Sequence, residues 1–181
     1  MGPQVNYEPE MWKRIAKDLK RNDVSGASHK LRHGCEEFFG TVCDSLQARV
    51  KYRLSARWEL GDLLPAAMSQ YRSLLKTAKS AAQSWGNKDD FESLQELDTT
   101  VGQIYQRCGA EQWAINANVH YNNWANFSKG DFQPLTEAFQ DLFAIFICTK
   151  CNGILHVIQK DMVPVGVRCN CGTVNWNLTK A

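Results

Sequence analysis

The sequence lacks any run of 18 apolar residues, so we expect no membrane-spanning helix. Its first residues, MGPQVNYEPEMWKR, contain no apolar h-region, which argues against a secretory signal peptide. Internal repeats and low-complexity segments are also missing. With 44% apolar and 22% charged residues, the chain of 181 residues is typical of one globular domain with a small appendage.

The motifs of several large enzyme classes are absent as well. The chain has no G-x-x-x-x-G-K-[ST] phosphate loop, no H-E-x-x-H zinc-protease helix and no G-x-S-x-G nucleophile elbow. The net charge is only +2, so the overall charge does not predict nucleic-acid binding. The charge is uneven, however: the first 80 residues carry 14 Lys and Arg against 9 Asp and Glu, whereas the rest carry 7 against 10.

Solvated helix faces are the simplest explanation of this uneven charge. A sharper interpretation is a basic surface around Lys51, Arg53 and Arg57 that binds phosphates or an acidic partner. Trp58 follows these cations, and an exposed indole could stack on a nucleic-acid base. A place in the hydrophobic core is the simpler alternative for this tryptophan.

Apolar residues recur at intervals of three and four over most of the first 146 positions, which predicts amphipathic helices. The expected helices span 10–22, 28–50, 63–85, 91–107 and 132–146, with a short sixth helix after residue 113. The stretch DVSGAS, between the first two helices, is expected to break the helical pattern.

Several residues have types that suit helix ends. Asp62 is expected to cap the third helix, with Pro65 in the first turn, where a missing N–H costs nothing. Gly86 or Asn87 is a plausible left-handed stop for the same helix. The sequence SKGD at 128–131 has the form of a capping box before the last helix.

Four of the seven cysteines lie near the end of the chain, in the pattern C-x2-C-x17-C-x-C. These are Cys148, Cys151, Cys169 and Cys171. Thiolates are soft ligands that suit Zn²⁺ in a closed tetrahedral site, so we expect one structural zinc ion. The alternatives are four reduced structural cysteines or two disulfides.

The segment between the two cysteine pairs predicts two short strands, at 153–159 and 163–169. A glycine after each pair is expected to let the chain turn with a positive φ. The motif and the strands resemble a zinc ribbon, although the second pair is tighter than the usual C-x2-C. We therefore expect a mainly α protein, with a bundle of five or six helices at 1–147 and a small β zinc ribbon at 148–181.

The other three cysteines are Cys35, Cys43 and Cys108, which lie on helix-like segments. An odd number of cysteines without a secretory signal fits reduced thiols better than a disulfide framework. The sequence thus predicts a cytoplasmic location.

Two short stretches resemble domains of the HEPN superfamily. HKLRHGCEEFF at 29–39 is similar to the helix of these domains that reads L-R-x-x-x-E, and WAINANVHYNNW at 113–124 is similar to their N-x-x-x-H stretch. The resemblance spans roughly residues 10–147 and implies an all-helical domain. The whole arrangement is also similar to the C-terminal regions of some bacterial SMC-like or AAA-type ATPases linked to anti-phage defence, which implies a larger ATPase as a partner.

Active HEPN domains are metal-independent RNases that use an R-x4-H motif, and this chain departs from that motif. The residue five positions before His120 is Ile115, and none of the other three histidines has an arginine at that distance. Arg32 and Glu36 are separated by four residues, which is an ordinary helix pair. The enzymatic alternative is a diverged RNase with Arg32, Glu36 and His120 at its centre.

From these observations we expect a non-catalytic, zinc-binding interaction or regulatory module. It would present a basic helical surface and a rigid ribbon to nucleic acid or to a protein partner, within a prokaryotic anti-phage defence complex. A third interpretation is an assembly role, in which an apolar patch docks a coiled-coil ATPase.

Overall fold

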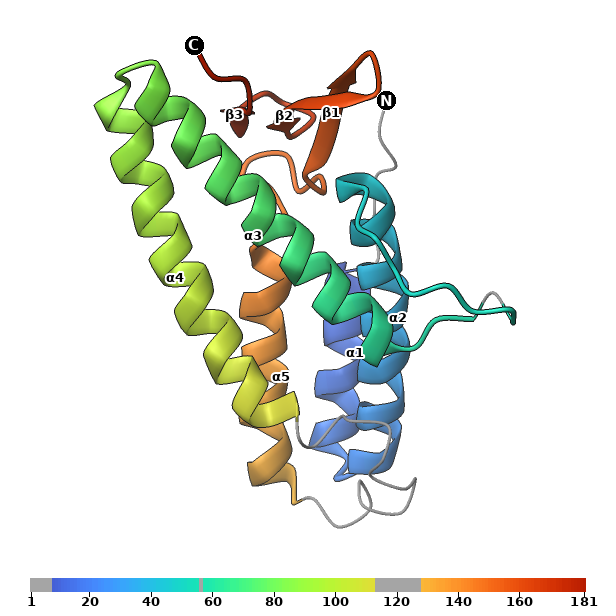
Figure 1. The fold of residues 1–181 in the computed structure, drawn as a ribbon. Coiled ribbons are helices and arrows are strands. Elements are labelled where there is room, and N and C mark those ends of the chain that lie inside the picture. The colour runs from blue at the N-terminus through green and yellow to red at the C-terminus, as the bar shows by residue number, and fades with distance from the viewer. Residues whose placement is uncertain (1–7, 56, 113–127) are drawn as a thin grey trace.

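The computed structural model describes residues 8–55, 57–112 and 128–181. Five helices lie within these residues: α1 (Glu8–Lys20), α2 (Val24–Leu46), α3 (Leu60–Ser84), α4 (Lys88–Gln112) and α5 (Lys129–Ala144). Each helix packs on the next in the chain, and α5 also contacts α2 (Figure 1). The predicted mainly helical class is confirmed. None of the described helices is long and apolar enough to cross a bilayer.

Two helix starts show how side-chain caps set the boundaries. The break expected in DVSGAS is wrong, because Asp23 caps a helix there: its carboxylate accepts a hydrogen bond from the Gly26 N–H at 2.8 Å, and α2 begins at Val24. The helix ends before Gln47, which has a left-handed φ of 57°. The capping box predicted at 128–131 is confirmed at the start of α5.

The start of α3 differs from the prediction. Glu59, not Asp62, is the N-cap, and Asp62 is the reciprocal partner in a capping box. The helix therefore begins earlier than expected, and Pro65 lies inside it, beyond the first turn. The predicted left-handed stop is confirmed, since Gly86 has a φ of 68°.

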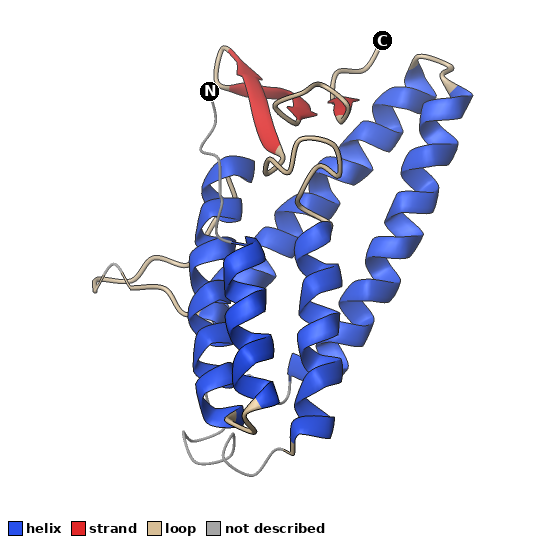
Figure 2. Cartoon of the chain, turned by 180° about the vertical axis from the view of Figure 1, so that it is seen from behind, coloured by secondary structure: helices blue, strands red, loops and turns tan. Residues whose placement is uncertain are grey.

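The chain ends in a three-stranded antiparallel sheet of order β1-β2-β3. Its strands are β1 (His156–Lys160), β2 (Val163–Arg168) and β3 (Asn175–Asn177). The first two confirm the predicted strands, whereas the third is too short to show an alternating pattern. The sheet covers one end of the bundle, where β1 contacts α2 and β3 contacts α3 (Figure 2).

One hydrophobic core runs from the bundle into the sheet. Phe146 is completely buried, and its ring lies 5.8 Å from that of Phe39 and 5.2 Å from that of Tyr71. Tyr71 on α3 also meets Trp176 on β3, at 5.5 Å between ring centroids. Aromatic packing therefore joins the sheet to the helices.

Candidate metal centre and exposed basic loop

The first cysteine pair lies on a tight turn directly after α5. The Asn152 N–H donates to the Cys148 carbonyl at 2.8 Å, and the Cys148 N–H donates to the Gly153 carbonyl at 3.0 Å. The positive φ of this turn belongs to Asn152, at 52°, and not to the glycine as expected. At Gly153 a Cβ would lie 2.8 Å from the Asn170 amide nitrogen, so a larger residue there would require the Asn170 side chain to move.

The second pair forms a similar turn after β2. The Gly172 N–H donates to the Cys169 carbonyl at 3.1 Å, and the Val174 N–H donates to the Cys169 sulfur at 3.2 Å. Gly172 has a φ of 75°, as the sequence predicts for this position. Because β1 and β2 are antiparallel, the hairpin returns this turn to the first one.

The four sulfurs of Cys148, Cys151, Cys169 and Cys171 all lie within 4.8 Å of one another. The Cys171 sulfur is 3.7 Å from that of Cys148 and 3.5 Å from that of Cys169. A tetrahedral zinc site with Zn–S bonds of about 2.3 Å has sulfur atoms about 3.8 Å apart. The sulfur cluster is therefore compatible with one tetrahedral metal ion.

The surroundings of the four thiols differ. Cys148 and Cys169 are buried, whereas Cys171 is exposed. Burial raises the pKa of Cys148 to about 11. Hydrogen bonding from the Thr173 hydroxyl, 3.1 Å from the sulfur, lowers the pKa of Cys171 to about 6. The backbone N–H of Gly153 lowers the pKa of Cys151. Two of the four groups are thus predisposed to the thiolate form that binds metal.

His156 begins β1 and is not one of the four clustered ligands. Replacing His156 with alanine is expected to leave one metal ion per chain, because four thiolates complete a tetrahedral shell. Elemental analysis of the purified variant measures this directly. Loss of the ion from His156→Ala protein would show that the histidine is a ligand.

The predicted binding residues lie on one loop, between α2 and α3, which projects from the body (Figure 1): they are Lys51, Arg53, Arg57 and Trp58. Two side-chain interactions involve these residues. Arg53 binds both carboxylate oxygens of Asp62, at 2.9 and 2.7 Å, and this lowers the pKa of Asp62. The Trp58 indole N–H donates to the Lys51 carbonyl at 2.8 Å. Arg53 therefore has a structural role that its residue type does not reveal.

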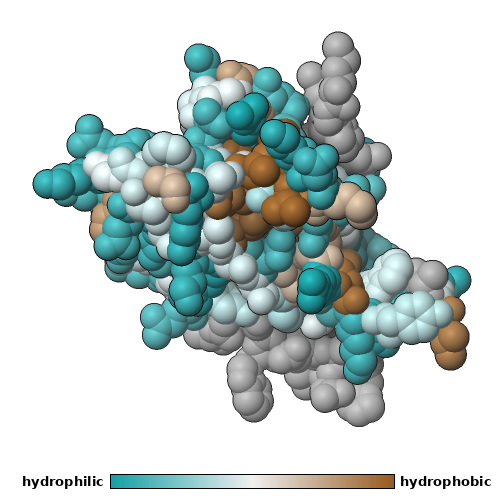
Figure 3. Space-filling model, turned by 45° about the horizontal axis from the view of Figure 1, so that its top comes forward, coloured by the Kyte–Doolittle hydropathy of each residue, from teal (hydrophilic) through white to brown (hydrophobic). Residues whose placement is uncertain are grey.

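The same loop exposes two apolar side chains that the sequence analysis did not single out, Tyr52 and Leu54, in addition to Trp58, which it did. Tyr52 is 80% exposed, Leu54 is 91% exposed and Trp58 is 41% exposed. Figure 3 shows hydrophobic colour at the outer end of the projecting loop. The sequence does contain a signal for this exposed apolar surface. Several large apolar residues lie in a long connection between two predicted helices, where no apolar helix face requires them.

The residues of the RNase alternative are only partly within the described chain. Arg32 Nε lies 3.1 Å from Glu36 Oε1, and the two side chains are partly exposed on α2. The imidazole of His33 lies 4.0 Å from the same carboxylate. His120 lies outside the described residues, so its predicted proximity to the pair stays a prediction.

The remaining three cysteines are part of the core. Cys35 is fully buried, the Cys43 thiol donates to the Leu63 carbonyl at 3.3 Å, and the Cys108 thiol donates to the Ala138 carbonyl at 3.0 Å. Burial raises the pKa of Cys35 and Cys43, so these thiols are protonated at neutral pH. They act as small apolar side chains.

Comparison with known proteins gives no relative. No protein-family model, no curated protein and no solved structure matches this chain. The suggested resemblance to HEPN domains and the expected place in a defence complex with a larger ATPase therefore stay predictions.

Proposed function

We propose that this chain is a non-catalytic binding module that presents the loop of residues 47–59 to single-stranded nucleic acid. The observation that carries the proposal is that Tyr52, Leu54 and Trp58 are all exposed on one projecting loop. The same loop carries the exposed cations Arg49, Lys51 and Arg57. Aromatic faces bind successive bases by stacking, and neighbouring cations bind the phosphates.

The charges of the loop support this proposal. Arg49, Lys51 and Arg57 are exposed and make no ion pair with any residue that the structure describes. Arg53 is already neutralised by Asp62, so we remove it from the predicted contact set and assign it to the loop's internal support. The Arg53–Asp62 ion pair and the hydrogen bond from the Trp58 indole to the Lys51 carbonyl limit the conformations of the loop before binding, which lowers the entropic cost of association.

A zinc ribbon completes the proposed module. Zinc is the metal that suits four thiolates in a closed tetrahedron, and such a site has no open position for a reacting water. Its proposed role is to hold the two turns together, so that the sheet supports the end of α2 from which the loop departs. The side chains of Gln47 and Gln159, which contact each other, link the base of the loop to β1.

Binding is tested with zinc-loaded protein and short fluorescent RNA and DNA strands, by fluorescence anisotropy between about 50 and 200 mM salt. Tyr52→Ala is expected to weaken binding about 5- to 100-fold, the effect of losing one stacked base. Joint replacement of Lys51 and Arg57 with glutamine is expected to reduce the slope of log affinity against log salt by about 1.4, the value for two phosphate contacts on a single strand.

The matched control replaces Arg72 and Lys76, two exposed cations on α3, with glutamine. This variant loses the same charge and is expected to bind like the wild type. The proposal would be contradicted if the Tyr52 variant and the Lys51 and Arg57 double variant bound single strands as tightly as the wild type. Tighter binding of duplex than of single strands by the wild-type protein would contradict it as well. Cleavage of the RNA without added metal, abolished in His120→Ala protein, would instead favour the RNase alternative with Arg32 and Glu36.

A further inference from the structure

Strand β3 forms one edge of the described sheet, because it pairs with β2 on one side only. Two hydrogen bonds show which of its backbone groups face β2. Val174, just before the strand, accepts from the Cys169 N–H at 3.1 Å, and Leu178, just after it, donates to the Val165 carbonyl at 3.0 Å. Hydrogen-bonded residues alternate along an antiparallel ladder, so the backbone of Trp176, midway between these two, also bonds to β2.

The backbone groups of Asn175 and Asn177 face away from β2 by the same alternation. Neither residue makes a backbone hydrogen bond to any described residue outside the sheet, and both are exposed. Each offers one N–H donor and one carbonyl acceptor. This edge of the sheet therefore presents backbone groups that a further strand can pair.

A groove follows the edge, between β3 and the junction of α3 with α4. Figure 1 shows β3 beside the end of α3 that leads into α4. Asn175, Trp176 and Asn177 all line the groove. Successive side chains of a strand point to opposite faces of the sheet, so a hollow that all three residues line lies along the edge of the strand.

The opposite wall of the groove supplies an aromatic surface and a charge. The Trp85 side chain is 59% exposed, and its indole N–H donates to the Thr179 carbonyl at 2.8 Å, which holds the ring at the groove. Asp90 is the one ionisable residue among the described residues that line the groove. It accepts from the Asn87 side-chain amide at 2.6 Å and makes no ion pair with a described residue. The groove therefore favours a ligand that carries a cation.

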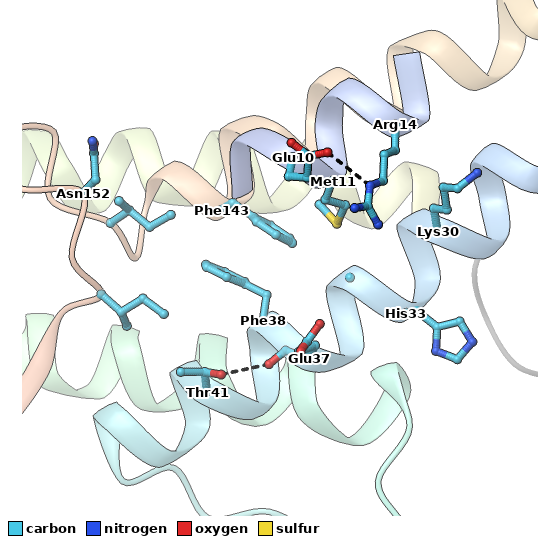
Figure 4. Close-up of a pocket in the computed structure, with 13 residues that line it drawn as sticks. Glu10, Met11, Arg14, Lys30, His33, Glu37, Phe38, Thr41, Phe143 and Asn152 are labelled. Carbon is cyan, nitrogen blue, oxygen red and sulfur yellow. Dashed lines mark hydrogen bonds and ion pairs between the residues drawn. The ribbon is translucent and has the colours of Figure 1, made fainter. Parts of the chain in front are cut away.

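The hollow drawn in Figure 4 offers a ligand less than this groove does. It lies between α1 and α2, where Gly34 lies against the Met11 side chain. The stacked rings of Phe38 and Phe143 in its lining are 5% and 1% exposed, so they present almost no apolar surface. The arginine and the lysine of its lining already contact carboxylates. The edge of β3 is therefore the better candidate for a binding site.

We propose that the groove binds an extended peptide, which adds a strand to the sheet along β3 and places a lysine or arginine side chain at Asp90. An extended chain is the ligand that fits, because its own N–H and carbonyl groups alternate with the spacing of those on Asn175 and Asn177. An apolar side chain of the peptide lies against Trp85. The proposal goes beyond nucleic-acid binding and does not depend on it.

Amide hydrogen exchange of the zinc-loaded chain, followed by NMR, tests the backbone pairing with the peptide Ac-Val-Thr-Lys-Thr-Val-NH2. The amides of Asn175 and Asn177 are expected to exchange about tenfold more slowly at a peptide concentration about ten times the dissociation constant, because they then exchange only from the free protein. The amide of Trp176 already bonds to β2, so its exchange is expected to change little.

The charge is tested separately. Asp90→Asn keeps the shape of the side chain and is expected to weaken binding of this peptide about two- to fivefold, the usual effect of losing an exposed ion pair. The same variant is expected to bind a peptide with norleucine in place of lysine as tightly as the wild type does. The matched control is Glu92→Gln, which removes an exposed carboxylate of α4 that does not line the groove.

Unchanged exchange at Asn175 and Asn177 in the presence of the peptide would overturn the proposal. Equal weakening by Glu92→Gln and Asp90→Asn, or equal weakening of both peptides by Asp90→Asn, would overturn it too. Slow exchange of both amides in the chain alone, with a dimer in sedimentation, would show that a second copy of the chain covers the edge instead. Tyr52→Ala protein is expected to bind the peptide normally, so failure here and failure of nucleic-acid binding are distinguishable.

Discussion

Replacing Cys169 with serine is expected to release the metal ion and to unfold the β-ribbon, while the helices stay folded. Cys169 is 4% exposed, and its sulfur lies within 4.8 Å of the other three sulfurs of the cluster, so a serine there would leave only three thiolates for a metal ion. A structural Zn²⁺ supplies roughly 10 kcal/mol or more to the folding of its site.

Two measurements on the Cys169→Ser protein check this result. Elemental analysis should fall from one zinc ion per chain to none. Amide hydrogen exchange should lose protection in β1 and β2, while the amides of α2 and α3 keep theirs. Retention of a full equivalent of zinc would refute the metal assignment, and unchanged exchange in the strands would refute the structural role.

Cys43→Ser is the control for the loss of a buried thiol. Cys43 lies in the core, and its sulfur donates to the Leu63 carbonyl at 3.3 Å. A serine hydroxyl can donate to the same carbonyl, so the substitution leaves no unsatisfied polar group. This variant is expected to keep its zinc and the exchange protection of the ribbon.

Replacing Phe146 with alanine is expected to lower the free energy of unfolding by about 3 to 5 kcal/mol, the usual cost of truncating a buried phenylalanine. The ring is completely buried and contacts those of Phe39 and Tyr71, on two different helices. Its carbonyl accepts from the Leu155 N–H at 2.9 Å, beside the first cysteine turn. The loss is a large fraction of the typical total of 5–15 kcal/mol.

Urea unfolding at saturating zinc measures this loss, and Phe146→Leu is the matched control. Leucine keeps most of the apolar contact and should cost only about 1 to 1.5 kcal/mol. The zinc content of both variants should stay at one ion per chain, because neither substitution changes a sulfur or a turn. A loss below about 1 kcal/mol for alanine would show that the core repacks around this position.

The helices and the cysteines that could hold a metal ion were accessible from the sequence because their signals are local. The five longer helix spans that we expected all overlap described helices, α1 to α5, since the apolar face of a helix repeats at every turn. Boundaries were less accurate. Asp23 begins a helix where a break was expected, because the polar and glycine residues of DVSGAS serve equally well as a first turn.

The candidate surfaces were only partly predictable. Lys51 and Arg57 were chosen from their charge as part of a basic helical surface, whereas the structure places them on the exposed loop between α2 and α3. Arg53 was chosen for the same reason, yet it binds Asp62, which lies nine positions later in the chain. Residue type does not distinguish a free cation from a paired one when the partner depends on how a loop closes.

The sequence by itself determined that this protein is mainly helical and that two close cysteine pairs follow the last helix, because both properties depend on neighbours within a few positions. Only the tertiary structure decided that the four sulfurs lie within 4.8 Å of one another, that the sheet shares the core of the bundle and that Gly34 lies against Met11. These features depend on the angles and distances at which separate elements pack, and those follow from the shapes of many side chains acting together.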